Sequence, residues 1–175
     1  ALSPDGTRLA VSALSPEGAQ IWIKQLPNGA VSRLTTGGSN TRPHWTSDGS
    51  QIAYVSTRSG RRGAWLQRFD GSAKPESLLV DARQLNEVLP IPNSRSYVVR
   101  MVVGWDLFTF TPGTDSALKP LLVGPAVSSG ADLSPDGKWF AYIGKESGRP
   151  EIYVRRLDDP GAARTMVSID GGEEP

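Results

Sequence analysis

The stretch that decides the fold is a tight turn with the strand after it, Ser134-Pro135-Asp136-Gly137 followed by Lys138-Trp139-Phe140-Ala141-Tyr142-Ile143. Pro fixes a φ angle that suits the second position of a turn. Asp bonds to its own backbone, and Gly accepts the positive φ that closes the turn. The aromatic and β-branched residues that follow favour a pleated, half-buried surface. The stretch therefore predicts a turn that leads directly into a β-strand.

The same turn recurs at a nearly constant spacing. Its other copies are Ser3-Pro4-Asp5-Gly6, Thr46-Ser47-Asp48-Gly49 and the degenerate Ile91-Pro92-Asn93-Ser94. From Asp5 through Asp48 and Asn93 to Asp136, the spacings are 43, 45 and 43 residues. A period of roughly 40 to 50 residues with four strands in each period is typical of β-propeller blades. No stretch sustains a 3.6-residue hydrophobic period, so we expect almost no helix.

The period divides the chain into four expected blades, each a four-stranded antiparallel meander. Their approximate ranges are 1–40, 41–83, 84–128 and 129–175. In the first blade we expect strands at residues 7–13 and 20–26, joined by a loop at residues 14–19. This blade starts in the middle of a strand, and propellers of about four to eight blades are known. We therefore predict an all-β fold, a partial β-propeller that is an excerpt of a larger ring.

Three parts of the chain resemble a known repeat. They are residues 20–26 with 33–35, residues 133–142 with 146–154, and residues 167–175. These parts resemble the WD40-like repeat called PD40, familiar from the TolB propeller. They are more similar still to the propeller that follows the kinase domain of many bacterial serine/threonine protein kinases. The resemblance implies a periplasmic or extracytoplasmic sensor or interaction platform, in a parent protein that a missing segment anchors in the membrane.

Composition and motifs argue against chemistry within the chain itself. The chain has no glycine-rich nucleotide loop, His-Arg-Asp or Asp-Phe-Gly motif, so a kinase domain would lie outside it. It has no cysteine, which excludes disulfides and thiolate metal sites. The formal net charge of +1 favours neither nucleic acid nor a membrane surface as partner. No apolar run approaches the roughly 20 residues that cross a bilayer, so we expect no membrane insertion by this segment.

Single residues also favour a scaffold over a catalytic or metal site. His44 is the only histidine, so it cannot complete a catalytic triad. We expect it on an inner strand, packed or bonded to backbone, with ligand binding as the alternative. The repeated turn residues belong to different blades, so we expect them to stabilise their own hairpins rather than bind metal: Asp5, Gly6, Asp48, Gly49, Asp136 and Gly137. We expect no cofactor, and we expect the five tryptophans to pack between blades: Trp22, Trp45, Trp65, Trp105 and Trp139.

Topology indicates where a partner would bind. In such a meander, the repeated turns share one edge of the sheets. The loops between second and third strands share the other edge with the connections between blades. These loops differ from blade to blade, and variable loops on a rigid scaffold commonly carry recognition. The predicted contact residues are Asn40, Arg42, Arg58, Arg61, Arg62, Arg83, Asn86, Glu87, Lys145, Glu146, Arg149, Glu173 and Glu174.

The sequence therefore favours a non-catalytic propeller segment that binds a protein or peptide, or senses a ligand. One possible parent is a bacterial envelope or signalling protein, including a serine/threonine kinase. The basic loop at residues 58–62 is either a solvated loop or a partner contact. A nucleic-acid site there would need a wider basic stripe. Two alternatives remain, a structural accessory subunit of a larger membrane complex and the accessory propeller of a hydrolase. A catalytic propeller such as a lyase or lactonase would need more carboxylates or histidines along its channel.

Overall fold

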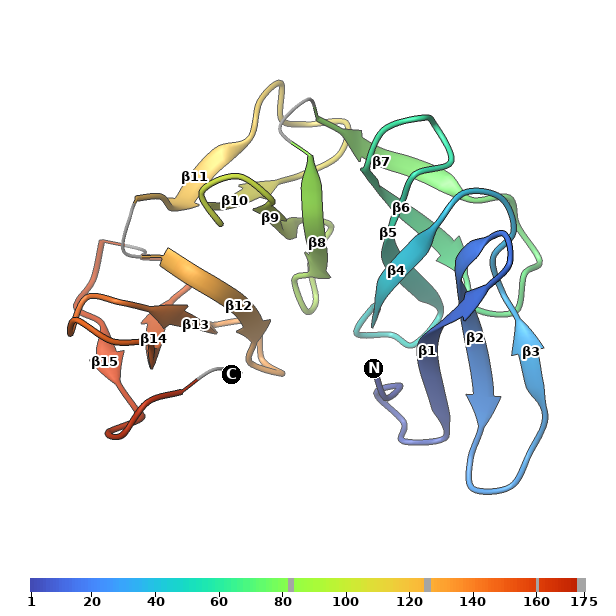
Figure 1. Ribbon diagram of the computed structural model, residues 1–175, viewed down its shortest axis with the longest axis horizontal. Helices are drawn as coiled ribbons and strands as arrows, with labels where there is room; N and C mark the ends of the chain where they lie inside the picture. Colours follow the sequence, from blue (N-terminus) through green and yellow to red (C-terminus); the bar gives the residue numbers. More distant parts are fainter. Residues whose placement is uncertain (82–83, 125–126, 160, 173–175) are drawn as a thin grey trace. The chain divides into compact units, whose positions relative to one another are not determined.

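The computed structural model describes residues 1–81, 84–124, 127–159 and 161–172, and these residues form an all-β protein. Figure 1 shows the strands, which are arranged in four antiparallel sheets. The expected all-β propeller architecture is confirmed. Within the described part of the chain, no helix has the length and apolar character needed to cross a membrane.

The first two sheets contain the strands of the first two repeats. The first sheet has the order β1-β2-β3, with β1 (Arg8–Ser15), β2 (Gly18–Gln25) and β3 (Val31–Arg33). The second has the order β4-β5-β6-β7, with β4 (Asn40–Trp45), β5 (Gln51–Ser56), β6 (Gly63–Arg68) and β7 (Glu76–Val80).

The other two sheets follow the same meander. The third has the order β8-β9-β10-β11, with β8 (Leu85–Pro90), β9 (Tyr97–Met101), β10 (Leu107–Phe110) and β11 (Lys119–Leu122). The fourth has the order β12-β13-β14-β15, with β12 (Val127–Leu133), β13 (Trp139–Gly144), β14 (Glu151–Arg156) and β15 (Thr165–Met166). The chain divides into two compact units, Ala1–Pro90 and Ile91–Pro175.

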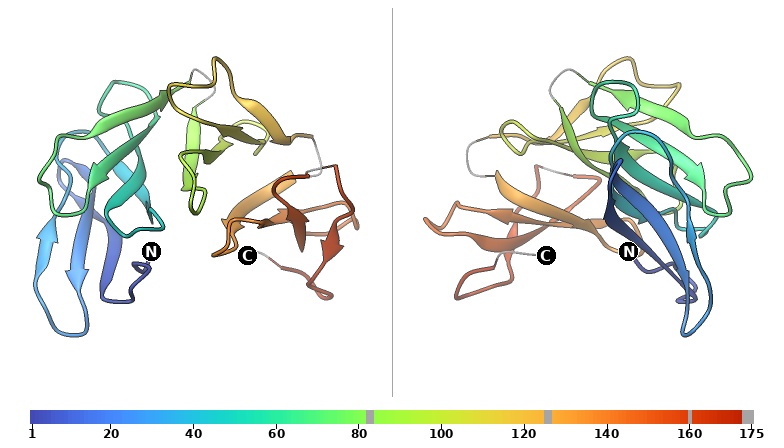
Figure 2. Two further views of the ribbon diagram at one scale, coloured as in Figure 1. Left: turned by 180° about the vertical axis from the view of Figure 1, so that it is seen from behind. Right: turned by 45° about the vertical axis from the view of Figure 1, so that its right-hand side comes forward.

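The core of the first unit lies between its first two sheets. Figures 1 and 2 show these sheets, in blue and in cyan to green, side by side. Ile21 and Ile23 of β2 pack with Ile52 and Tyr54 of β5 in one buried cluster. The strand predicted at residues 20–26 therefore buries one face against the next repeat, which is how stacked repeats stabilise each other.

The turn between β1 and β2 is shorter than the predicted loop at residues 14–19. The two strands pair without interruption from Arg8 opposite Gln25 to Ser15 opposite Gly18. Ser15 Oγ donates to the Gly18 carbonyl at 2.6 Å and accepts from the Glu17 N–H at 3.3 Å. Two-residue turns are the commonest hairpin connections. The predicted loop is wrong because these bonds extend both strands to the turn itself.

Aromatic pairs mark the core of the second unit. Tyr97 and Phe110 stack with ring centroids 5.5 Å apart, and Tyr142 and Tyr153 with centroids 5.6 Å apart. Such pairs contribute about 0.5–1.5 kcal/mol beyond the area that they bury. Each pair joins neighbouring strands of one sheet, so aromatic residues stabilise the interior of both sheets.

Candidate functional site

The repeated Asp residues bind the turns in which they lie. Asp48 Oδ1 accepts from Thr46 Oγ1 at 2.6 Å and from the Ser50 N–H at 3.0 Å. Asp5 and Asp136 make the same two bonds with their neighbours. The glycine after each Asp has a φ of about +70°. Hydrogen bonds, first of all from the preceding hydroxyl group, lower the pKa of all three carboxyl groups. We call the edge that carries these turns the turn edge. Its Asp side chains are engaged in hydrogen bonds within their own turns.

These lowered pKa values predict how stability depends on pH. A carboxyl group whose folded pKa is depressed stabilises the folded state above its unfolded pKa of about 4, and this contribution is lost as the pH falls. In the triple variant Asp5→Asn, Asp48→Asn, Asp136→Asn, the amide oxygen remains an acceptor but the charge is removed. We expect its melting temperature, followed by circular dichroism, to lie below wild type at pH 7 and to approach wild type near pH 2. A difference that does not change with pH would contradict this explanation.

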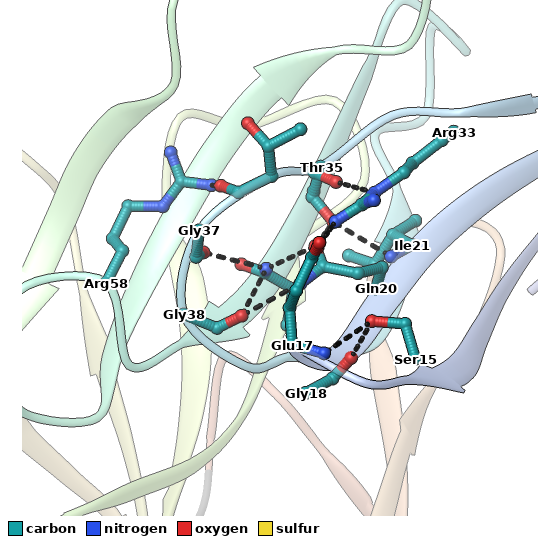
Figure 3. Close-up of polar contacts among 12 residues, drawn as sticks. Ser15, Glu17, Gly18, Gln20, Ile21, Arg33, Thr35, Gly37, Gly38 and Arg58 are labelled. Atoms are coloured by element: carbon teal, nitrogen blue, oxygen red, sulfur yellow. Dashed lines mark hydrogen bonds and ion pairs between the residues drawn. The ribbon is translucent and has the colours of Figure 1, made fainter.

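At the other edge, buried polar side chains fix the connection between the first two sheets (Figure 3). Gln20 Nε2 donates to the Gly38 carbonyl at 2.9 Å, and Gln20 Oε1 accepts from Thr35 Oγ1 at 2.9 Å. Asn40 Nδ2 donates to Gln20 Oε1 at 2.9 Å and to the Gly37 carbonyl at 3.1 Å. Gln20 and Asn40 are fully buried. The prediction of Asn40 as an exposed contact residue is wrong, because its amide group stabilises the connection from inside.

Arg58 is held by the same connection. Its guanidinium donates to the Thr36 carbonyl at 3.2 Å and to Ser56 Oγ at 3.3 Å. The guanidinium carbon also lies 5.0 Å from the centre of the Trp65 ring. Figure 3 shows Arg58 beside the glycines of the connection. A Cβ on Gly38 would lie 2.7 Å from the backbone nitrogen of Arg58, so the backbones at Gly38 and Arg58 approach each other closely.

The other sheets use a related arrangement that sequence analysis missed. Near the start of β10, Asp106 Oδ1 accepts from the Gly124 N–H at 3.1 Å. At the start of β14, the Glu151 carboxylate accepts from the Gly171 N–H at 3.1 Å. In three sheets, therefore, a Gln, Asp or Glu near the start of the second-to-last strand binds a glycine that follows the last strand of the sheet. The available signal was a polar residue before an apolar strand, followed by glycine some 18 to 20 residues later.

Glu151 also binds a predicted contact residue. Its Oε1 accepts from Arg149 Nε at 2.6 Å, and its Oε2 accepts from Ser168 Oγ. The bond from Ser168, followed by that from Arg149, lowers the Glu151 pKa. The Arg149 guanidinium also donates to the Ile169 carbonyl. Arg149 is thus partly engaged in fixing the connection.

A second set of predicted contacts lies on inner strands instead of loops. Asn86 and Glu87 are buried residues of β8, so their assignment to an exposed loop is wrong. Glu87 Oε1 lies 3.2 Å from His44 Nε2 and 3.6 Å from an Arg42 guanidinium nitrogen. His44 is therefore paired with a carboxylate, whereas we expected packing or a backbone bond. Arg42 has a φ of +54° beside a register shift of β4, and its side chain remains exposed.

The remaining predicted contact residues differ in their exposure and in whether their side chains have partners. Glu146 is half-buried and accepts from the Tyr142 hydroxyl at 3.1 Å. Arg61 and Lys145 are exposed and Arg62 is half-buried. None of these three cations forms an ion pair within the described part of the chain. Arg83, Glu173 and Glu174 lie outside the described residues. Among the residues that are described, no group of three His, Cys, Asp or Glu could hold a metal ion.

The sheets and their connections have the β-propeller fold seen in TolB. TolB from Acinetobacter baumannii superposes with a TM-score of 0.78 at 18% identity, over 98% of this chain and 43% of that one. The tricorn protease superposes with a TM-score of 0.74 at 13% identity, over 96% of this chain and 22% of that one. Likeness at such identities shows the fold alone, because one fold supports many functions.

The sequence is also similar to several curated proteins, although no family model matches it. An uncharacterized protein of Agrobacterium fabrum, Atu1656, is 27% identical over 156 residues, which cover 81% of this chain and 52% of that protein. The Tol-Pal system protein TolB of Bordetella pertussis is 24% identical over 117 residues, which cover 66% of this chain and 27% of TolB. The chain thus spans about half of the first relative and about a quarter of the second.

Proposed function

We propose that this chain is a non-catalytic propeller segment that binds a protein or peptide through the edge formed by its variable loops. We call these loops, with residues 57–62 as the turn in the first unit and residues 102–106 and 145–150 as the turns in the second unit, the loop edge. One observation carries the proposal. Gln20, Asp106 and Glu151 fix the loop edge internally, whereas the side chains of Arg61, Arg62 and Lys145 at its surface have no partner among the described residues. Preorganised loops reduce the entropy cost of binding.

The free cations indicate the chemistry of the partner. Arg61 and Arg62 follow the tethered Arg58 in one turn, so they lie on a fixed backbone with unpaired guanidinium groups. Arg binds carboxylates through two parallel hydrogen bonds. Complementary charge at an exposed rim mainly accelerates association and selects the partner. We therefore propose an acidic peptide segment as the partner of this turn.

The test uses short random peptides displayed on phage and selected against the chain. We expect the selected peptides to be rich in Asp and Glu, and to bind the double variant Arg61→Glu, Arg62→Glu roughly tenfold more weakly, mainly through slower association at low salt. The matched control is Lys74→Glu, Lys138→Glu, which makes the same change of charge at the turn edge. Arg58 is left intact because its substitution would also disturb the connection. Equal loss in both variants, or none in either, would contradict the proposal.

A narrower proposal concerns the cellular location of the segment and the protein to which it belongs. Similarity to a Tol-Pal system protein supports a periplasmic location and a role as an accessory subunit of an envelope complex. The resemblance to kinase-linked propellers supports a sensor region of a serine/threonine kinase. Stoichiometric co-purification with a complex would favour the subunit. A kinase domain in the flanking reading frame would favour the sensor.

An accessory propeller of a hydrolase is the second candidate. It is considered because the same propeller fold occurs in a prolyl endopeptidase, with a TM-score of 0.66, and in the tricorn protease, with a TM-score of 0.74. A hydrolase domain in the same reading frame would establish it. Peptide binding by the loop edge of this chain alone would favour the first candidate.

A further inference from the structure

One turn of the loop edge differs from the others in chemistry. The turn between β9 and β10 exposes Val103 to 74% and Trp105 to 37%, and the nearby connection exposes Val123 to 54%. The corresponding turns of the second and fourth sheets contain Arg61, Arg62 and Lys145 instead. We call Val103, Trp105 and Val123 the apolar patch. An exposed apolar group at loop tips that are usually polar indicates an interaction site.

The backbone of this turn is unfavourable for the residue that it carries. Gly104 and Trp105 have φ values of +80° and +59°. Turns with positive φ at successive positions are dominated by Gly, Asn and Asp. A bulky side chain in this region is a genuine outlier, and such strain clusters at binding and active sites. Trp105 therefore stands where local stability favours a different residue.

Two contacts fix the apolar patch in place. The Arg100 guanidinium carbon lies 5.4 Å from the centre of the Trp105 ring, and Arg100 itself is buried. The bond from the Gly124 N–H to Asp106 Oδ1 holds the connection that carries Val123 against the turn. The Trp105 indole N–H has no acceptor within the described residues. The patch thus presents a fixed ring face and one unused hydrogen-bond donor.

We propose that the apolar patch binds an apolar side chain of a peptide partner, and that the Trp105 N–H donates to a carbonyl group of that peptide. This inference rests on the proposed function and adds the chemistry of one contact. Buried Trp residues commonly dominate the energy of protein interfaces.

The size of the apolar patch and the charges around it favour a peptide over a second copy of the chain or a membrane surface. A second copy of the chain would need about 800 Å² on each side for a stable interface, which is more than three partly exposed side chains supply. A membrane surface favours basic residues around the inserted group. The charged residue within residues 102–106 is Asp106, an acid, and the neighbouring Arg100 is buried.

The test compares stability with binding in two variants. Trp105→Asn places a residue that tolerates positive φ in the turn, so we expect an unchanged or higher melting temperature. Affinity for the phage-selected peptides that contain an apolar side chain should fall about thirtyfold or more. The matched control is Trp139→Asn, because Trp139 is 40% exposed and lies 5.6 Å from the Arg156 guanidinium carbon, but has no positive φ. It should lower the melting temperature and leave affinity unchanged.

Each outcome decides between the alternatives. If Trp105→Asn lowers the melting temperature as Trp139→Asn does and leaves affinity unchanged, Trp105 is a packing residue and the inference is overturned. If all selected peptides bind the Arg61→Glu, Arg62→Glu variant more weakly but bind Trp105→Asn as tightly as wild type, the inference is overturned and the proposed function is supported. Failure to select any peptide would overturn both.

Discussion

Replacement of Gly38 by Ala is expected to lower the free energy of unfolding by about 3 kcal/mol. The glycine has a φ of +68°, a region that costs a residue with a Cβ about 1–2 kcal/mol. The new Cβ would also lie 2.7 Å from the backbone nitrogen of Arg58 and 2.9 Å from the Arg58 Cα. Overpacking of this kind costs a further 1–3 kcal/mol or so. Urea unfolding followed by circular dichroism measures the change.

The adjacent glycine provides the control. Gly37 has a φ of +74°, but nothing lies within 4 Å of its ideal Cβ. Gly37→Ala should therefore cost only about 1 kcal/mol. The effect of Ala on the unfolded chain is the same at both positions, so the difference isolates the close approach of the two backbones. Equal effects at Gly37 and Gly38 would show that the connection does not rest on the Arg58 turn.

Replacement of Tyr54 by Ala is expected to lower the free energy of unfolding by about 3–5 kcal/mol, as for other large core residues. Tyr54 is fully buried in the cluster that joins the first two sheets. Its hydroxyl donates to Gln67 Oε1 at 3.2 Å, and burial raises its pKa to about 12. The same urea unfolding experiment tests this value.

Two further variants separate packing from hydrogen bonding at this position. Tyr54→Phe keeps the ring and removes one buried hydrogen bond, so about 1 kcal/mol should be lost. Leu14→Ala removes a side chain that is 91% exposed and should change stability by less than about 0.5 kcal/mol. If Tyr54→Ala cost no more than Leu14→Ala, the core would not lie between the first two sheets.

The repeated turns could be predicted from sequence because their interactions are local. Asp48 binds residues two positions away on either side, so the motif itself contains the physical cause of the turn. The fourfold repetition then predicts a propeller. The proposed blade boundaries remain a prediction, because the contacts that define two compact units do not test them.

Contacts between residues far apart in the sequence could not be predicted in the same way. His44 and Glu87 meet across 43 residues, and Gln20 and Asn40 across 20. Sequence shows that these residues are polar but not which of them are paired, so sequence alone predicts Asn40 and Glu87 at the surface. Trp105 was expected to pack between blades because tryptophan favours burial. The structure instead places it at a turn whose positive φ its own residue type disfavours.

The most direct test of the central claim is hydrogen–deuterium exchange on the chain with and without a phage-selected peptide. The claim is that the loop edge binds the partner and the turn edge is scaffold. We predict slower exchange with peptide at residues 57–62 or 102–106, and no change at residues 46–50 and 134–138. Slower exchange at residues 46–50 and 134–138, with the loop edge unchanged, would contradict the claim.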